Sequence, residues 1–122
     1  SYRLGRPCIY IGEDLNHMYF VPLANLNSKI KEKQFVIAPN AKNNLTKKSR
    51  IRASELITRP VAFYELYGRL DYFDIQKLIE SLRFFYKDDN PNFQLINHLI
   101  DKYINYVDLE LDVKDKAYYK HK

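Results

Sequence analysis

The side chains that could do chemistry in this chain are cations, hydroxyls, amides, phenols and imidazoles. The single Cys8 and three scattered histidines, His17, His98 and His121, lack the spacing of a zinc site. The sequence also lacks a Gly-rich phosphate loop and the short motifs of zinc peptidases and serine hydrolases. We therefore expect no metal and no cofactor, and any reaction would use Arg, Lys, Ser, Asn, Tyr or His.

Positive charge is concentrated in the first half of the chain. Residues 1–59 contain 11 Lys/Arg and 4 Asp/Glu, and residues 60–122 contain 9 and 11, within a net charge of +5. A basic front half is typical of a surface that binds a polyanion. A solvated lysine-rich surface explains the composition equally well.

A β-hairpin over residues 6–25 is the element that would position this chemistry. Its apolar runs, 8–11 and 18–21, flank a polar turn at 12–16. Both runs are apolar on both faces, which predicts a central place in a sheet. Because the strands are antiparallel, Arg6-Pro7 and residues 22–25 would lie side by side at the open ends of the hairpin.

Further strands are predicted over 34–38 and 49–54, with one more short strand within 61–70, and residues 55–59 form either a strand or a short helical turn. In the second of these, SRIRAS alternates strictly, so Arg50 and Arg52 would share an open face. Lysine-rich and Asn-rich loops at 26–33 and 40–48 surround these strands. Lys31, Lys33, Arg50 and Arg52 are therefore candidates to hold a phosphate backbone.

Two helices and a last strand complete the expected domain. Asp71 is predicted to cap the first helix, with Asp74 in its first turn, and Asn90-Pro91 to start the second. From Val107 to Val113, apolar residues alternate with acidic ones, which predicts a strand. The 122 residues are thus expected to form one α+β domain with an antiparallel sheet.

The location of the protein is predicted from three features of the sequence. No apolar run is long enough to span a membrane. The chain has no charged-then-apolar leader with a cleavage site. Cys8 falls in a predicted core strand, where it would be a buried structural thiol. Together these features favour a cytoplasmic protein with no membrane partner.

The order of elements resembles a family of toxins. An RP dipeptide, an apolar strand, a polar turn and an apolar strand ending in Pro-Leu are followed by SRIRASELITRP and YGRLDYFDIQKLIESLRFF. This set, from Arg6 to Tyr86, resembles the MazF/PemK-like and ToxN/AbiQ-like endoribonuclease toxins of bacterial toxin–antitoxin systems. The resemblance implies a small, SH3-like, curved antiparallel β-barrel with C-terminal helices. It also implies metal-independent cleavage of single-stranded RNA, by attack of the 2′-hydroxyl on the adjacent phosphate.

The resemblance also implies roles for particular residues. Arg6 matches the arginine before the proline and would stabilise the charge that builds up on the phosphorane. Ala24 stands where these toxins usually have Thr or Ser, and the amide of Asn25, which follows it, cannot act as a base. Proton transfer would then move to Ser28, Lys29 or His121, to His17, or be lost. An ordinary exposed loop is an equally good interpretation of Ser28 and Lys29.

The C-terminal stretch resembles the first strand of these toxins, which the chain lacks before Arg6. We hypothesise that the strand from Val107 to Val113 fills that position. It could do so by circular permutation, by a strand swap between subunits, or through an unusual arrangement of the expressed chain. Tyr119 and His121 would then approach Arg6, where Tyr119 could stack on RNA.

Two other functions fit the sequence. The first is a catalytically inactive module that binds RNA or protein on the same barrel, which the Ala24 departure favours. The second is an adaptor domain that binds a partner through its amphipathic helices. For the toxin, the expected partners are single-stranded RNA and a cognate antitoxin, either RNA or protein, with a homo-oligomer as a further option.

Overall fold

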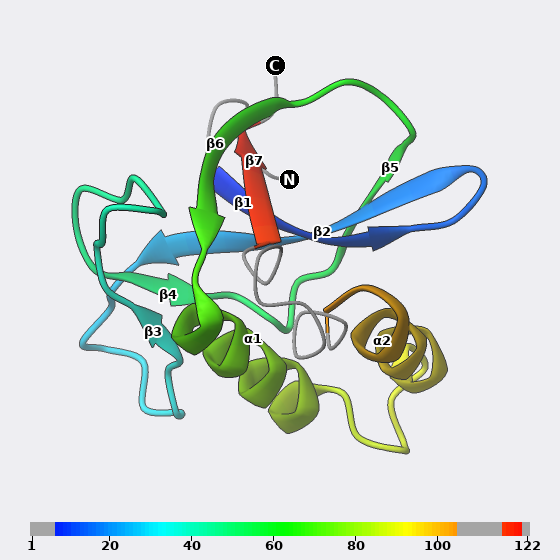
Figure 1. Ribbon diagram of the computed structural model, residues 1–122. Coiled ribbons are helices and arrows are strands. Elements are labelled where there is room, and N and C mark those ends of the chain that lie inside the picture. Colours follow the sequence, from blue (N-terminus) through cyan, green and yellow to red (C-terminus); the bar gives the residue numbers. More distant parts are fainter. Residues whose placement is uncertain (1–6, 105–115, 121–122) are drawn as a thin grey trace.

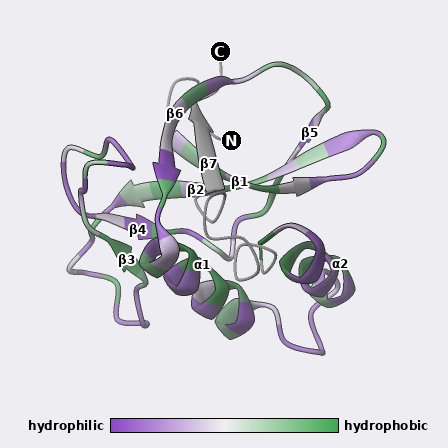
Figure 2. Cartoon of the chain, viewed as in Figure 1, coloured by the Kyte–Doolittle hydropathy of each residue, from purple (hydrophilic) through white to green (hydrophobic). Residues whose placement is uncertain are grey.

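The computed structural model describes residues 7–104 and 116–120, and its architecture is α+β. An antiparallel sheet of several strands is packed against two helices (Figure 1). Both helices carry hydrophobic as well as hydrophilic residues (Figure 2), as expected of amphipathic helices that cover a sheet. The predicted α+β class and antiparallel sheet are therefore confirmed.

The predicted hairpin is confirmed and is central. Strand β1 (Pro7–Glu13) pairs with β2 (His17–Asn25), and a short loop joins them. The register shifts between Tyr10 and Gly12, which marks a β-bulge, and Gly12 has a φ of 139°. A Cβ at Gly12 would lie 2.6 Å from Tyr103 Cδ2, so this position requires glycine.

Strand pairing gives the order β3–β4–β2–β1–β7–β6, with β5 beside another part of β2. The bounds are Val36–Ile37 for β3, Ser49–Ile51 for β4, Ile57–Pro60 for β5, Glu65–Leu70 for β6 and Lys116–Lys120 for β7. Strand β4 is shorter than the predicted 49–54, so Arg52 lies just beyond it.

The sheet does not close into the predicted barrel within the part of the chain that the structure describes. Strands β3 and β6 are the ends of the sheet and do not pair with each other. The loop between β3 and β4 reaches β6 instead, because Arg69 N donates to Lys42 O at 2.8 Å. Asn44 Nδ2 also donates to Tyr67 O, at 2.8 Å. A loop, rather than a strand ladder, therefore bridges the two ends of the curved sheet.

Residues 116–120, near the end of the chain, form a strand inside the sheet. Strand β7 pairs with β1, with Lys120 opposite Pro7, and with β6, with Lys120 opposite Glu65. No strand is predicted for these residues, because they form a basic, aromatic tail in the sequence. The predicted strand from Val107 to Val113 lies outside the described residues.

The helices begin where capping residues allow. Helix α1 (Tyr72–Phe85) has the predicted cap, since Asp71 Oδ1 accepts from Asp74 N at 2.8 Å. Helix α2 (Phe93–Leu99) begins later than predicted: Asn92 is its N-cap. Asn90 instead closes a turn, in which its carbonyl accepts from Phe93 N at 3.0 Å. A π-helical turn, η1 (Ile100–Ile104), continues α2.

Two hydrophobic clusters cover the two faces of the hairpin and explain its uniformly apolar strands. The larger one joins Ile9, Ile11 and Val21 to α1, α2 and η1. The smaller one joins buried Cys8, Met18 and Phe20 to Ile57 and Tyr64. Within residues 7–104 and 116–120, no helix is long and apolar enough to cross a lipid bilayer.

Candidate functional site

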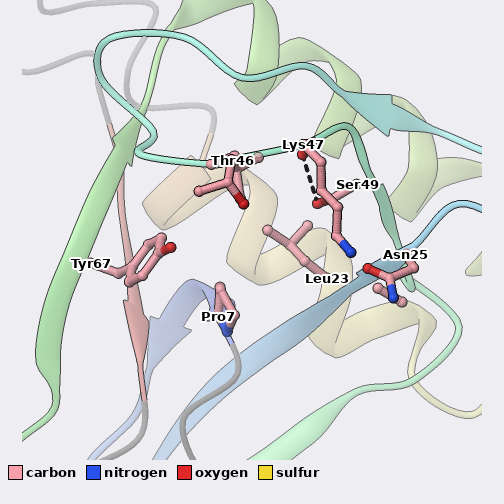
Figure 3. A pocket seen from close by; sticks show the side chains of 9 residues that line it. Pro7, Leu23, Asn25, Thr46, Lys47, Ser49 and Tyr67 are labelled. Atoms are coloured by element: carbon pink, nitrogen blue, oxygen red, sulfur yellow. Dashed lines mark hydrogen bonds between the residues drawn. The ribbon is translucent and has the colours of Figure 1, made fainter.

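A cavity of about 180 Å³ lies at the open ends of the hairpin (Figure 3). We call it the hairpin cavity. It is formed by the start of β1, the end of β2, the loop between β3 and β4, and β6. Its lining residues are Pro7, Leu23, Ala24, Asn25, Leu45, Thr46, Lys47, Ser49 and Tyr67.

Strand register explains why these residues meet. Cys8 pairs with Pro22, so Pro7 and Leu23 come together at the ends of β1 and β2. Asn25 pairs with Ser49, which places the end of the β3–β4 loop at the same edge. The predicted meeting of a polar loop with the start of the first strand is therefore confirmed for Pro7. Arg6 itself lies outside the described residues.

The polar groups of the cavity are one cation, two hydroxyls, an amide and a phenol. Ser49 is buried, and its Oγ donates to Lys47 O at 3.3 Å (Figure 3). The exposed side chains of Thr46 and Lys47 make no hydrogen bond or ion pair with any other described residue. Figure 3 shows the Lys47 amine directed toward Leu23 and Asn25. A cation beside hydroxyl and amide donors is suited to bind an oxyanion such as a phosphate.

A second cavity, of about 80 Å³, is lined by residues 50–52 and by the end of the loop between β2 and β3. We call it the basic cavity, because Lys33, Arg50 and Arg52 line it, with Glu32 as its one acidic residue. Arg50 Nε donates to Asn25 O at 3.0 Å, and Arg52 Nη2 lies 2.7 Å from Glu55 Oε2. Burial lowers the pKa of Arg50, and the charge of Arg52 lowers it further. Arginine is protonated in proteins, so Arg50 is a cation.

Asn25 connects the two cavities. It lines the hairpin cavity, and its carbonyl oxygen accepts from Arg50, which lines the basic cavity. Strand β4 makes this possible, because Ser49 lines the first cavity and the next residue, Arg50, lines the second. An extended anionic chain could therefore contact both cavities across the end of β2.

The other predicted site residues are placed differently. Ser28, Lys29 and Lys31 are exposed in the loop between β2 and β3 and line neither cavity. Tyr119 lies in β7, where it pairs in register with Cys8 and Leu66. His121 lies outside the described residues, one position beyond Lys120.

The sequence reasoning missed Thr46, Lys47, Ser49 and Tyr67. The run NLTKKS does combine hydroxyls and cations, but its place depends on the pairing of β2 with β4. No local pattern predicts that pairing. The missing hydroxyl at Ala24 was a usable signal, because Thr46 lines the same cavity as Ala24.

Among the described residues, no group of three or more His, Cys, Asp or Glu could hold a metal ion. In comparisons with known proteins, no protein-family model, curated protein or solved structure matches this chain.

Proposed function

We propose that this protein is a metal-independent endoribonuclease that cuts single-stranded RNA. The observation that carries the proposal is the hairpin cavity, where Lys47 and Thr46 lie beside Pro7, the residue after Arg6. The resemblance of the sequence to MazF/PemK-like and ToxN/AbiQ-like toxins supports the same reaction. We include the SH3-like barrel of those toxins in the proposal, with the curved sheet as an open form of it.

The reaction would use the groups of the cavity at the scissile phosphate. The ribose 2′-oxygen forms a bond to phosphorus, and the bond from phosphorus to the 5′-oxygen breaks. Lys47 and Arg6 stabilise the negative charge of the phosphorane, and the Thr46 hydroxyl donates to a non-bridging oxygen. The 2′-hydroxyl gives its proton to a base, and the leaving 5′-oxygen takes one from an acid.

The C-terminal end of β7 is the proposed source of the base. Lys120 pairs in register with Pro7, which lines the cavity, and we propose that the next residue in the sequence supplies the base. His121 is that residue, and an unperturbed imidazole can accept a proton near neutral pH. Ser28 and Lys29 are less suited, because neither lines the cavity.

The basic cavity would hold a neighbouring phosphate of the same strand. Lys33, Arg50 and Arg52 provide three cations there, and Asn25 lies between them and the hairpin cavity. Phosphate contacts of this kind position RNA without reading its sequence. In the proposed setting, a bacterial cytoplasm, an antitoxin of RNA or protein would cover the two cavities.

Cleavage of a mixed-sequence single-stranded RNA in EDTA tests the proposal. We expect the parent protein to cut, and Lys47→Met to cut about 100-fold more slowly, because a transition-state cation is lost. Lys29→Met is the matched control: it removes the same charge from a loop outside the cavity. Arg6→Ala should match Lys47→Met. An intact RNA with the parent protein, or equal rates for the Lys47 and Lys29 variants, would refute the proposed site.

A non-catalytic RNA-binding module is the second candidate, and Ala24 favours it. Its methyl group lines the cavity where the toxins usually have a hydroxyl. For this function, the parent protein would bind RNA without cutting it at any pH. Lys47→Met would then weaken binding, and the affinity would still fall steeply with added salt.

A further inference from the structure

The loop that carries Thr46 and Lys47 is hydrogen-bonded to a buried carboxylate, that of Asp74. We propose that Asp74 is a positioning residue for the hairpin cavity. It orients this loop through its hydrogen bonds with Asn40 and Asn43. The effect on RNA rests on the proposed function, whereas the effect on the loop does not. The loop comprises residues 38–48, between β3 and β4.

Asp74 accepts hydrogen bonds from the side-chain amides of two loop residues. It lies in the first turn of α1 and is only 8% exposed. Its Oδ2 accepts from Asn40 Nδ2 at 3.2 Å and from Asn43 Nδ2 at 3.3 Å. Asn40 Nδ2 also lies 3.4 Å from Asp71 Oδ2. The side chains of two residues 31 to 34 positions away are thus fixed to one end of α1.

Asn43 passes this constraint to the loop backbone. It is fully buried, and its Nδ2 also donates to Ala38 O at 2.9 Å. Its Oδ1 accepts from Asn40 N at 3.1 Å and from Leu45 N at 3.0 Å. Leu45 is the residue before Thr46, so the direction in which Thr46 and Lys47 leave the loop depends on Asn43.

Strand β6 fixes the loop from the other side. A Cβ at Gly68 would lie 2.5 Å from Asn43 O and 2.7 Å from the Asn43 carbonyl carbon. The loop backbone can approach β6 this closely only because residue 68 has no side chain. Asn43 therefore lies between Gly68 and Asp74. Thr46 and Lys47 follow it by three and four positions in the sequence.

The carboxylate of Asp74 also stabilises the positive end of α1, but its side-chain hydrogen bonds are with the loop. Asp71 already caps α1, and Asp74 contributes only its backbone N–H to that cap. Burial raises the pKa of the Asp74 carboxyl, and the charge of Asp71 raises it further, although the Asn amides lower it. Burial therefore disfavours the ionised form of Asp74, and the hydrogen bonds from the two loop amides stabilise it.

The test compares Asp74→Ala with Asp74→Asn in the full chain. The alanine leaves both amides without their acceptor, whereas the asparagine keeps an acceptor oxygen. We expect Asp74→Ala to raise amide hydrogen exchange of Asn40, Asn43 and Leu45 about tenfold or more, because their N–H groups donate to the Asn40 and Asn43 side chains. RNA cleavage and binding should fall with it, and Asp74→Asn should restore both measurements. Asp89→Ala, on the exposed α1–α2 connection, controls for the loss of one negative charge.

Each outcome decides one question. Unchanged loop exchange in Asp74→Ala would overturn the proposal, as would a loss of RNA cleavage that Asp74→Asn fails to restore. If Asp74→Ala does not fold, Asn40→Asp replaces it, because it removes the amide donor to Asp74 and keeps the oxygen that accepts from Lys42 N and Asn43 N. If the parent protein neither binds nor cuts RNA, the proposed function fails, but faster loop exchange in the variant would still support the positioning role.

Discussion

The polar side chains near the two ends of the β1–β2 hairpin differ in their hydrogen bonding. At the tip, Asp14 Oδ1 accepts from Asn16 N at 2.9 Å and from His17 N at 2.8 Å. Its Oδ2 accepts from Tyr19 OH at 2.6 Å. At the open end, the side chains of Thr46 and Lys47 have no such partner among the described residues.

This contrast separates a structural polar group from one available to a ligand. The hydrogen bond from Tyr19, together with those from the Asn16 and His17 amides, lowers the pKa of Asp14 to about 2. A perturbed pKa is often taken as a sign of function. Here the lowered pKa reflects hydrogen bonds within one turn. The proposed site instead contains Thr46 and Lys47, whose side chains have no hydrogen-bond partner among the described residues.

The largest effect on folding is expected from Gly12→Ala, near the tip. The new Cβ would meet the side chains of Tyr103 and Leu99, and the φ of 139° is strained for alanine. We expect the free energy of unfolding to fall by about 3 kcal/mol, from strain and overpacking together. Urea denaturation measures this change. Leu15→Ala, at a side chain 96% exposed, should change it by less than about 0.5 kcal/mol.

A smaller effect, on RNA binding, is expected from Arg50→Gln at the open end. The loss of one phosphate contact should weaken binding about tenfold and reduce the salt slope by about 0.7. Fluorescence anisotropy over a range of salt concentrations measures both quantities. Arg83→Gln, at an exposed position in the last turn of α1, should leave the slope unchanged. Equal effects of the two substitutions would mean that only net charge matters.

The smallest effect is expected from Tyr19→Phe, which should raise the pKa of Asp14 from about 2 toward 3.8. A carboxyl with a lowered pKa stabilises the fold above its unfolded value, and this contribution is lost as the pH falls toward the folded value. The variant should therefore lose less stability than the parent between these two pH values. NMR titration of the Asp14 carboxyl measures the shift. His17→Gln should shift it less, and neither change should alter RNA cleavage.

The hairpin and α1 could be predicted from sequence because local residues determine them. Apolar runs around a polar turn specify the hairpin, and Asp71 with Asp74 specifies the start of α1. Asn90-Pro91 had the same local signature for α2. Asn92 is the cap instead, because the Asn90 side chain accepts from Asn92 N and closes a turn.

The candidate site was only half predictable, because it depends on contacts between distant segments. Asn25 and Pro7 followed from the hairpin register, and Arg50 from strand alternation. Thr46 and Lys47 enter the cavity through β2–β4 pairing and through the Asn43 contacts with α1. A loop rich in Asn and Lys shows neither contact in its own sequence.

The position of β7 between β1 and β6 has a consequence for the order in which the fold can form. During synthesis, β2 can pair with β1, β4 and β5 as each emerges, but β1 and β6 are not connected until residues 116–120 exist and form the strand between them. Until then both strands present open edges, which favour pairing with other chains. Joining Pro7 to Lys120 also closes a loop that includes both helices. This long-range step should be slow, and it should set the rate at which the whole sheet folds.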